Sequence, residues 1–454
     1  MLLPYGVDTD GHVVVAAGRE VIDLSLMDGF DVDRQVFRSG SLNQFIALGP
    51  DAWARTRAQL LAALGDDSRP SVAARRAAPQ VQAGAGHESQ PAVPAAARRA
   101  TSDVVLIRPW TVGDYADFYA SREHVEAMGR MLRPGEDPLP PAWLHLPIGY
   151  HGRAGTVIVS GQPVYRPWGI RPGPSAPEPA GSTGIAPAAT AGGTGIHPAS
   201  PGGTGLASAT SAGGTGIAPA TSAGGTGIAP ATPPSAVPAG GAGSAAAPSY
   251  GPSLRLDVEV ELGFVVGVGV DRGQTITAAE AERHLFGMVV LNDWSARDIQ
   301  AFEYRPLGPF LGKSFATSIS PWVVPMAALE PYRAAGPVQD PEPASYLKAS
   351  EPRGFDIRLQ LCVNDSVISR MSSSGLYWSP AQMLAHLTAN GAGVRAGDLF
   401  GTGTISGPGP GASGSLMEHW QGERWLTDGD QVTMSAWCGD EPAGTVTGRV
   451  EARP

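Results

Sequence analysis

One long stretch of the chain carries no charged side chain, and it divides the residues that can build a folded body. Residues 179–254 contain no Asp, Glu, Lys or Arg. Inside this stretch a unit close to GGTGIAPATSA recurs, and its Thr-Gly pairs follow one another every 10 or 11 residues from Thr183 to Thr226. Each unit has one bulky apolar residue, too few to offset the entropy of ordering a Gly-rich backbone. We interpret the repeat as a loose surface loop; a binding role or a Gly-rich layered structure are the alternatives.

The sequence after the repeat has mainly the pattern of β-strands. The strand-like segments are LDVEVELGFVVGV, FGMVVLND, SPWVVPM, FDIRLQLCVND, QVTMSAWCG and AGTVTGRV, which are rich in β-branched and aromatic residues. Helical patterns are fewer: TAAEAERHLF, the segment around Arg297, and SPAQMLAHLTANG. The predicted fold is therefore mainly β with peripheral helices.

The N-terminal residues 1–105 are predicted to form a separate unit. VVVAAG and VIDLSL have the pattern of short strands, and LNQFIALGPDAWARTRAQLLAAL has that of a helix. Gly49 and Pro50 interrupt this helix, and Asp51 is its predicted N-cap.

The remaining domain boundaries follow from composition. The Ala- and Arg-rich residues 67–102 are interpreted as a linker or a mobile excursion. Residues 106–454 are predicted to form a second domain, which the low-complexity insert interrupts at about 171–250.

Charge and cysteine content exclude several classes of protein. The formal net charge of −10 argues against a general nucleic-acid binder, which needs a basic surface. Two cysteines, Cys362 and Cys438, form no disulfide scaffold and fit a reducing cytosol. The N-terminus MLLPYGVDTDG lacks the pattern of a signal peptide, and no apolar run approaches the roughly 18 residues of a membrane helix. The predicted location is cytoplasmic, without a membrane or nucleic-acid partner.

The segment LDVEVEL places three carboxylates at alternate positions. On a strand, Asp257, Glu259 and Glu261 would share one face, because side chains alternate with period two. No Lys or Arg in the segment relieves their repulsion. The face is either the solvated side of an amphipathic strand or a site for a hard divalent cation such as Ca²⁺ or Mg²⁺.

A second acidic cluster lies in GDYADFYASREH. If this segment is helical, Asp117, Ser121 and His124 fall on one face at i, i+4 and i+7. His124 is then either a structural histidine or a general base near an acid. The following WLHLPIGYHGR adds Tyr150 in a Pro- and Gly-rich turn.

In LNDWSARDIQAFE, polar residues follow the apolar run HLFGMVV. Asp293, Arg297 and Gln300 stand at i, i+4 and i+7, which predicts one helical face, whereas Asp298 falls on another. This face would combine an acid, a guanidinium and an amide at the end of a core strand.

Common phosphate, dinucleotide, zinc and serine-hydrolase motifs are excluded. Around Lys313, Gly308 and Gly312 enclose three residues where a P-loop needs four. Lys313 stands among apolar residues, so it either reaches water or serves a site. The Gly-rich GDLFGTGTISGPGPGASGSLMEHW lacks dinucleotide-binding spacing but supplies Thr404 and Glu418. There is no HExxH and no G-x-S-x-G.

Taken together, these blocks resemble the fumarylacetoacetase (fumarylacetoacetate hydrolase) family of tyrosine and phenylalanine catabolism. The similarity is strongest in DYADFYASREH, PAWLHLPIGYHGR, LDVEVELGF, LNDWSARDIQAFEYRPLGPFLGKSFATSISPWVVPM and GTISGP. It covers nearly the whole chain except the linker and the repeat. The resemblance implies an N-terminal SH3-like β-barrel, a C-terminal body of rolled β-sheet, and a homodimer.

The resemblance also implies roles for individual residues. It implies a Ca²⁺ or Mg²⁺ site from Asp117, Glu259, Glu261 and Asp293, bordered by Lys313 and Thr317, and it leaves Asp257 out. It implies a catalytic histidine, His124, oriented by Glu418. Arg297, Gln300 and Lys313 would stabilise developing negative charge or supply a proton. The implied substrate-binding residues are Tyr119, Arg133, Tyr150, Arg297, Gln300, Tyr304 and Thr404.

The implied reaction is hydrolysis of the C–C bond of 4-fumarylacetoacetate to fumarate and acetoacetate. A metal would polarise the diketo acid, and His124 would activate water. One alternative is a related acylpyruvate or fumarylpyruvate hydrolase or decarboxylase; those relatives generally lack such an N-terminal domain. The other is a non-catalytic binding protein, which would be expected to lose catalytic positions.

Overall fold

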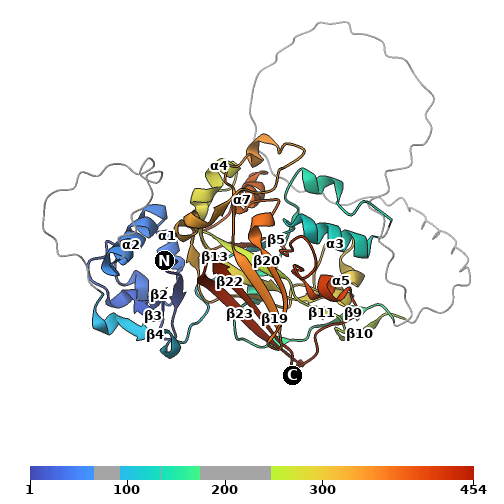
Figure 1. Ribbon diagram of the computed structural model, residues 1–454, viewed down its shortest axis with the longest axis horizontal. Helices are drawn as coiled ribbons and strands as arrows, with labels where there is room; N and C mark the ends of the chain where they lie inside the picture. Colours follow the sequence, from blue (N-terminus) through green and yellow to red (C-terminus); the bar gives the residue numbers. More distant parts are fainter. Residues whose placement is uncertain (66–92, 134, 174–246) are drawn as a thin grey trace, which may run out of the picture. The chain divides into compact units, whose positions relative to one another are not determined.

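The structure, a computed structural model, describes residues 1–65, 93–133, 135–173 and 247–454 (Figure 1). The repeat and its predicted loop conformation lie outside the described residues. The same holds for most of the predicted linker.

The largest sheet of the described residues has eight strands. In spatial order they are β6 (Gly149–His151), β5 (Tyr115–Phe118), β21 (Leu399–Gly401), β12 (Val260–Val266), β13 (Leu285–Asp293), β15 (Thr317–Ile319) and β7 (Val157–Val159), with β16 (Val324–Pro325) also on β13. The pairs β21–β5 and β15–β7 are parallel, and the other pairs are antiparallel. Segments far apart in the sequence thus become neighbours.

The central strands β12 and β13 of this sheet are buried on both faces, which explains their unbroken apolar runs. On β13, Met288 and Val290 belong to one hydrophobic cluster, while Val289 and Leu291 belong to a second. Polar residues at the end of such a strand are enclosed as well, and Asp293 is 1% exposed.

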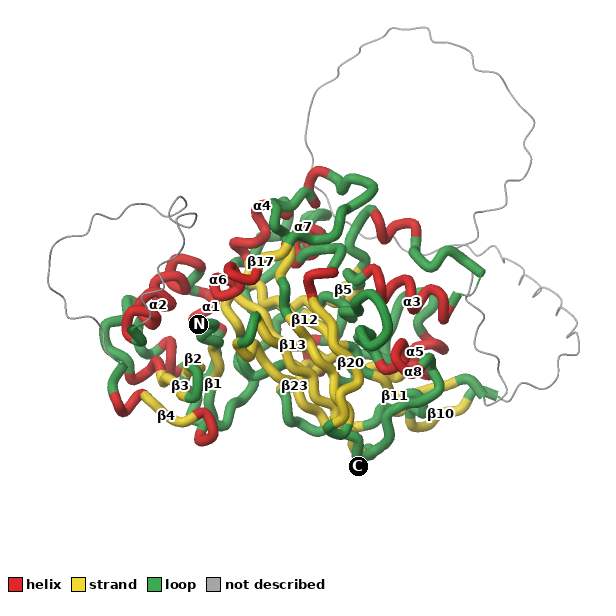
Figure 2. The backbone as a smooth tube through the Cα atoms, in the orientation of Figure 1, coloured by secondary structure: helices red, strands yellow, loops and turns green. Residues whose placement is uncertain are grey.

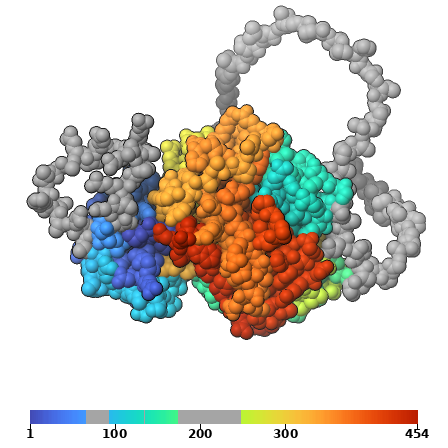
Figure 3. Space-filling model, viewed as in Figure 1, coloured from blue at the N-terminus to red at the C-terminus, as the bar shows by residue number. Residues whose placement is uncertain are grey.

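The first cluster fills the space between this sheet and a five-stranded one. The second sheet runs β20 (Ser366–Ser372), β19 (Arg358–Val363), β22 (Gln431–Cys438), β23 (Glu441–Glu451) and β8 (Val164–Tyr165). Its inward residues alternate along β22, where Val432, Met434 and Ala436 are buried. Figure 3 shows residues of the last third of the chain, orange to red, over much of the visible face.

Three two-stranded pairs also lie among the described residues. They are β9 (Trp168–Arg171) with β10 (Ser249–Pro252), β11 (Leu256–Asp257) with β14 (Ser295–Ala296), and β17 (Arg333–Ala334) with β18 (Gly354–Phe355). In the first pair Arg171 lies opposite Ser249, so the predicted insert boundaries of 171 and 250 fall inside strands.

Helices are few and lie around the strands, as the sequence predicts (Figure 2). Within the described residues they are α1 (Asn43–Ala47), α2 (Pro50–Ala63), α3 (Arg122–Leu132), α4 (Ala278–Ala281), α5 (Arg297–Glu303), α6 (Met326–Leu329), α7 (Pro380–Thr388) and α8 (Leu416–Trp420). None of the helices in this part of the chain has the length and apolar character that crossing a membrane requires. The fold is mainly β, as predicted.

The N-terminal residues form a four-stranded sheet that shares a core with the eight-stranded one. Its strands are β1 (Tyr5–Val7), β2 (Val13–Ala17), β3 (Glu20–Asp23) and β4 (Arg98–Ala100). Tyr5 packs against Phe45 and against Phe286 of β13, with ring centroids 5.2 and 6.0 Å apart. The boundary at residue 105 stays a prediction.

Two local predictions in this region are wrong. Residues 98–100 belong to β4 and not to a linker, because they pair with β3. Asp51 is not the N-cap of α2: Gly49 takes that position at a φ of 83°, which favours glycine, and Pro50 is the first helical residue.

Candidate metal and catalytic site

A cavity of about 480 Å³ collects most of the predicted site residues. Ten of the fifteen line it: Asp117, Tyr119, His124, Tyr150, Glu259, Arg297, Gln300, Tyr304, Lys313 and Thr404. Four others lie behind the lining and contact it or each other: Glu261, Asp293, Thr317 and Glu418. Its apolar lining includes Met128, Leu132, Leu307 and Trp425.

Four carboxylates meet at the base of the cavity. Asp117 comes from β5, Glu261 from β12 and Asp293 from the end of β13, and Glu259 immediately precedes β12. One oxygen of each lies within 4.8 Å of the others, and all four side chains are buried. The helical reading of Asp117 with His124 is wrong: Asp117 is in a strand because β5 pairs with β21 and β6, and helix α3 begins only at Arg122.

Strand β21 makes room for this cluster. It lies between β5 and β12, and its Gly401 is the register partner of Asp117. A Cβ on Gly401 would lie 2.6 Å from Glu261 Oε2 and 2.7 Å from Asp117 Oδ1. The next turn contributes a donor, because the amide of Gly403 donates to both oxygens at 3.2 Å.

The cluster holds more negative charge than its neighbours balance. Burial, and then the Asp293 carboxylate, raise the pKa of Asp117 to about 7. Burial and the other three acids raise the pKa of Glu261 well above its usual range. Glu261 Oε1 is buried and has no hydrogen-bond partner among the described residues. Buried hard oxygen ligands that repel one another fit a divalent cation such as Ca²⁺ or Mg²⁺.

Lys313 borders this cluster. Its Nζ donates to Glu259 and, at 2.8 Å, to Asp293 Oδ2. Asp293 also accepts from the hydroxyls of Thr317 and Tyr150, each at 3.1 Å. Burial disfavours the charged lysine, but the two carboxylates outweigh burial and raise the pKa of Lys313. Its ammonium therefore stays charged.

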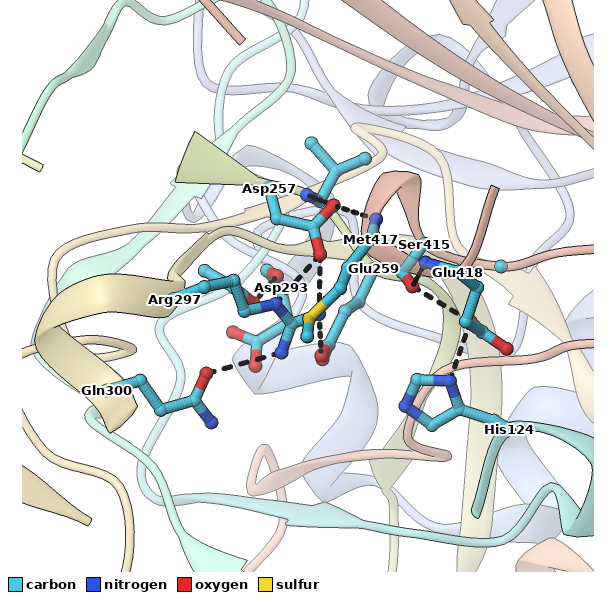
Figure 4. A network of polar contacts seen from close by, with 12 residues as sticks. His124, Asp257, Glu259, Asp293, Arg297, Gln300, Ser415, Met417 and Glu418 are labelled. Carbon is cyan, nitrogen blue, oxygen red and sulfur yellow. Dashed lines mark hydrogen bonds and ion pairs between the residues drawn. The ribbon is translucent and has the colours of Figure 1, made fainter. Parts of the chain in front are cut away.

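On another side of the cavity, His124 forms a pair with Glu418. His124 Nδ1 lies 2.7 Å from Glu418 Oε2 (Figure 4). Hydroxyls of Ser406 and Ser415 donate to the same carboxylate at 2.8 to 3.0 Å. Burial works against the charge of Glu418, but the His124 ring and these hydroxyls outweigh burial and lower its pKa. An ionised Glu418 assigns the proton to Nδ1 and leaves Nε2 as an acceptor.

Arg297 is held by two acids and one amide. Its Nη2 lies 2.7 Å from both Asp257 Oδ2 and Glu259 Oε1, and its Nη1 donates to Gln300 Oε1 at 3.2 Å. The predicted helical face through Asp293, Arg297 and Gln300 is wrong, because Asp293 ends β13 and α5 begins at Arg297. Arg297 and Gln300 are neighbours at i and i+3.

The acids of LDVEVEL do not form a solvated face. Asp257, Glu259 and Glu261 are all at most 5% exposed, and the segment is two strands with a break between them. Asp257 is absent from the four carboxylates that could bind a metal ion, as the resemblance implied. Asp298 also stays away from the cavity lining and accepts from Ser253 and Leu254.

Most of the predicted substrate-binding residues line the cavity, but Arg133 does not. Tyr119 packs edge to face on His124, with ring centroids 5.4 Å apart. Thr404 Oγ1 is buried and has no hydrogen-bond partner among the described residues. Arg133, by contrast, is outside the cavity lining and donates to the carbonyl of Pro138 at 2.8 Å. Its role as a substrate contact stays a prediction.

Sequence reasoning missed the residues that support the site. Ser415 and Glu418 stand in S-L-M-E, an S-x-x-E pattern that marks a helix start. Ser415 caps α8, and this pattern could have identified the partner of Glu418. Ser406 had no comparable signal. Arg255 and Trp425 also line the cavity, with the guanidinium 6.0 Å from the ring centroid.

Comparisons with known proteins agree with these features. Two family models match, "Fumarylacetoacetase N-terminal" over residues 2–88 and "Fumarylacetoacetate (FAA) hydrolase C-terminal" over residues 220–451. The fumarylacetoacetase of Bos taurus is 36% identical over 96% of this chain and 91% of its own length, and that of Arabidopsis thaliana is 35% identical over 100% and 95%. A fumarylacetoacetate hydrolase structure from Exiguobacterium antarcticum matches with a TM-score of 0.50 at 15% identity, covering 99% of both chains, which supports the fold alone. The chain belongs to the fumarylacetoacetase family.

Proposed function

We propose that this enzyme hydrolyses the C–C bond of 4-fumarylacetoacetate and yields fumarate and acetoacetate. The observation that carries this proposal is the union, in one cavity, of a four-carboxylate cluster with the His124–Glu418 pair. The near full-length similarity to fumarylacetoacetases supports the choice of substrate.

Asp117, Glu259, Glu261 and Asp293 would hold the divalent cation, Ca²⁺ or Mg²⁺. When bound, it supplies Lewis-acid polarisation of a β-dicarbonyl substrate and balances negative charge. Glu261 Oε1 has no hydrogen-bond partner in the described part of the chain, and the pKa values of Asp117 and Glu261 are raised; both observations support a cation at this place.

His124 would act as the general base. Because Glu418 faces Nδ1, Nε2 is the atom that takes a proton from the attacking water. The hydroxide equivalent adds to the carbonyl carbon of the fumaryl group. Cleavage of the adjacent C–C bond leaves a carbanion on the acetoacetate carbon, and the proton that Nε2 took from water balances the one that this carbon takes up.

Arg297, Gln300 and Lys313 would stabilise the negative charge that develops during these steps. For Lys313 the raised pKa favours charge stabilisation over proton donation. Tyr119, Tyr150, Tyr304 and Thr404 line the same cavity and would position the substrate.

Three further properties belong to this proposal. The four-stranded N-terminal sheet would be an SH3-like barrel, and the enzyme would act as a homodimer in the cytoplasm, as the family resemblance suggests. The two cysteines are free, which fits a reducing compartment. Sedimentation of the purified chain tests the dimer, and a monomer at micromolar concentration would contradict it.

Substrate choice is tested by turnover of matched diketo acids. The purified chain is expected to release fumarate and acetoacetate from fumarylacetoacetate, and to be slower on fumarylpyruvate and acylpyruvates. Turnover of fumarylpyruvate alone would assign the enzyme to the acylpyruvate hydrolases instead.

A further inference from the structure

Asp257 joins two parts of the site that are distant in sequence. Its side chain is fully buried and uses both oxygens. Oδ1 accepts from the amides of Leu416 and Met417 in the first turn of α8, at 2.9 and 3.2 Å, and from Val258 at 2.8 Å. Oδ2 faces Arg297, with Nε at 2.8 Å and Nη2 at 2.7 Å (Figure 4).

Each of these partners contacts or carries residues of the proposed site. Arg297 contacts Gln300 and Glu259. Helix α8 carries Glu418, whose carboxylate contacts His124. A single carboxylate therefore fixes the position of the guanidinium relative to the helix turn that orients the histidine. Both guanidinium contacts reach the same oxygen, Oδ2, and the hydrogen bond from Nε joins two charged groups, which makes it stronger than a bond between neutral groups.

Asp257 itself belongs neither to the candidate metal-binding carboxylates nor to the cavity lining. It is absent from the group of four acids and from the lining residues. A residue that is so placed acts on the reaction through its neighbours.

We propose that Asp257 is a positioning residue that couples Arg297 to the Glu418–His124 pair through the first turn of α8. The proposal rests on the proposed function. This role differs from that of Glu259 and Glu261, which stand in the same sequence pattern but belong to the group of four acids.

Asp257→Asn is the direct test, because it keeps the side-chain shape and one carbonyl oxygen. That oxygen can still accept from Leu416 and Met417, but the amide group then meets the donors of Arg297. We expect kcat for fumarylacetoacetate to fall by about 100-fold with KM little changed, as for a small misplacement of catalytic groups. Ca²⁺ affinity, measured by calorimetry, should stay that of the wild type.

Asp298→Asn is the matched control. Asp298 is also buried, follows Arg297 directly, and accepts from Ser253 and Leu254 outside the cavity lining. This variant removes the same charge and is expected to lose thermal stability while keeping kcat. An equal loss of kcat in the two variants would overturn the proposal.

A double-mutant cycle with Arg297→Lys shows whether Asp257 acts through Arg297. Lysine lacks the planar fork, so Asp257→Asn should lower kcat by no more than roughly twofold in that background. If Asp257→Asn lowers kcat by the same factor in the Arg297→Lys background as in the wild type, the proposal is overturned.

If Asp257→Asn does not fold, Asp257→Glu keeps the charge, shifts it by one methylene, and should give the same loss of kcat. Wild-type turnover keeps the two hypotheses apart: an inactive wild type contradicts the proposed function, whereas active wild type and an equally active Asp257→Asn contradict positioning alone.

Discussion

At the scale of single residues, the chemical type of a site residue was easier to predict than the residue that it contacts. The types and spacing of Asp117, Glu259 and His124 indicate candidates for metal binding or general-base catalysis. Local spacing cannot show that Glu418, 294 positions from His124, contacts its ring. That contact depends on the whole fold, and the family resemblance supplied it. For Arg133, which contacts the carbonyl of Pro138 outside the cavity lining, the transferred role stays a prediction.

The His124–Glu418 pair is tested by removing its base. His124→Ala should lower kcat by about 10²- to 10⁴-fold, the usual contribution of a general base. His419→Ala, one residue after Glu418 in α8, is the control and should keep wild-type turnover. Hydrolysis that survives in His124→Ala would show that another group activates water.

The two cysteines should differ in reactivity. Burial, and then Glu441, raise the pKa of the Cys438 thiol to about 12. Since a raised pKa favours the neutral thiol at every pH below that value, Cys438 should resist alkylation at pH 8 until the chain unfolds. Cys362 is partly exposed and should react first. Mass spectrometry of peptides after native labelling reads both sites, and equal labelling would contradict the buried position of Cys438.

At the scale of elements, strands with strong apolar runs were predicted well, and so were the short β2 and β3 in VVVAAG and VIDLSL, whereas β5 was not. FGMVVLND forms all of β13 except its first residue, and QVTMSAWCG contains the whole of β22. Tyr115–Phe118 resembles the start of a helix in sequence, yet it becomes β5 because a parallel neighbour, β21, comes from far along the chain. Such tertiary pairing overrides local propensity, and it is what carries Asp117 to the acidic cluster.

Strand β21 provides a test of the cluster. Gly401→Ala would place a methyl group between Glu261 and Asp117, so Ca²⁺ or Mg²⁺ affinity and kcat should both fall. Second-site changes around metals commonly cost about 10- to 100-fold in affinity. Gly375→Ala is the control, because a Cβ there meets nothing within 4 Å. Calorimetry with each variant reads the affinity; an unchanged value for Gly401→Ala would contradict the proposed cation position.

At the scale of the whole molecule, the sequence showed which residues could form a core but not how the core is shared. The division at residue 105 follows composition, whereas Tyr5 and Phe45 pack with Phe286 of β13. Because β12 and β13 are buried on both faces, their sequences do not show which segment covers each face. The predicted mainly β fold is confirmed, and the identity of its layers required the structure.

Removal of the repeat tests how independent the body is from it. Because Arg171 lies opposite Ser249 in the β9–β10 pair, a short connection can join these strands. Deletion of residues 180–248 should leave turnover nearly unchanged and alter the free energy of unfolding by less than about 1 kcal/mol. Assays and thermal unfolding of the shortened chain measure both quantities. A large fall in activity would mean that the repeat contributes to catalysis.

The central claim is a cation-dependent hydrolysis in the cavity that His124 and the four carboxylates share. The most direct measurement is turnover of fumarylacetoacetate by the purified full chain, before and after treatment with a chelator. We expect fumarate and acetoacetate to form, the activity to disappear with the chelator, and added Ca²⁺ or Mg²⁺ to restore it. Absence of turnover with either ion, or turnover that the chelator leaves unchanged, would contradict the account.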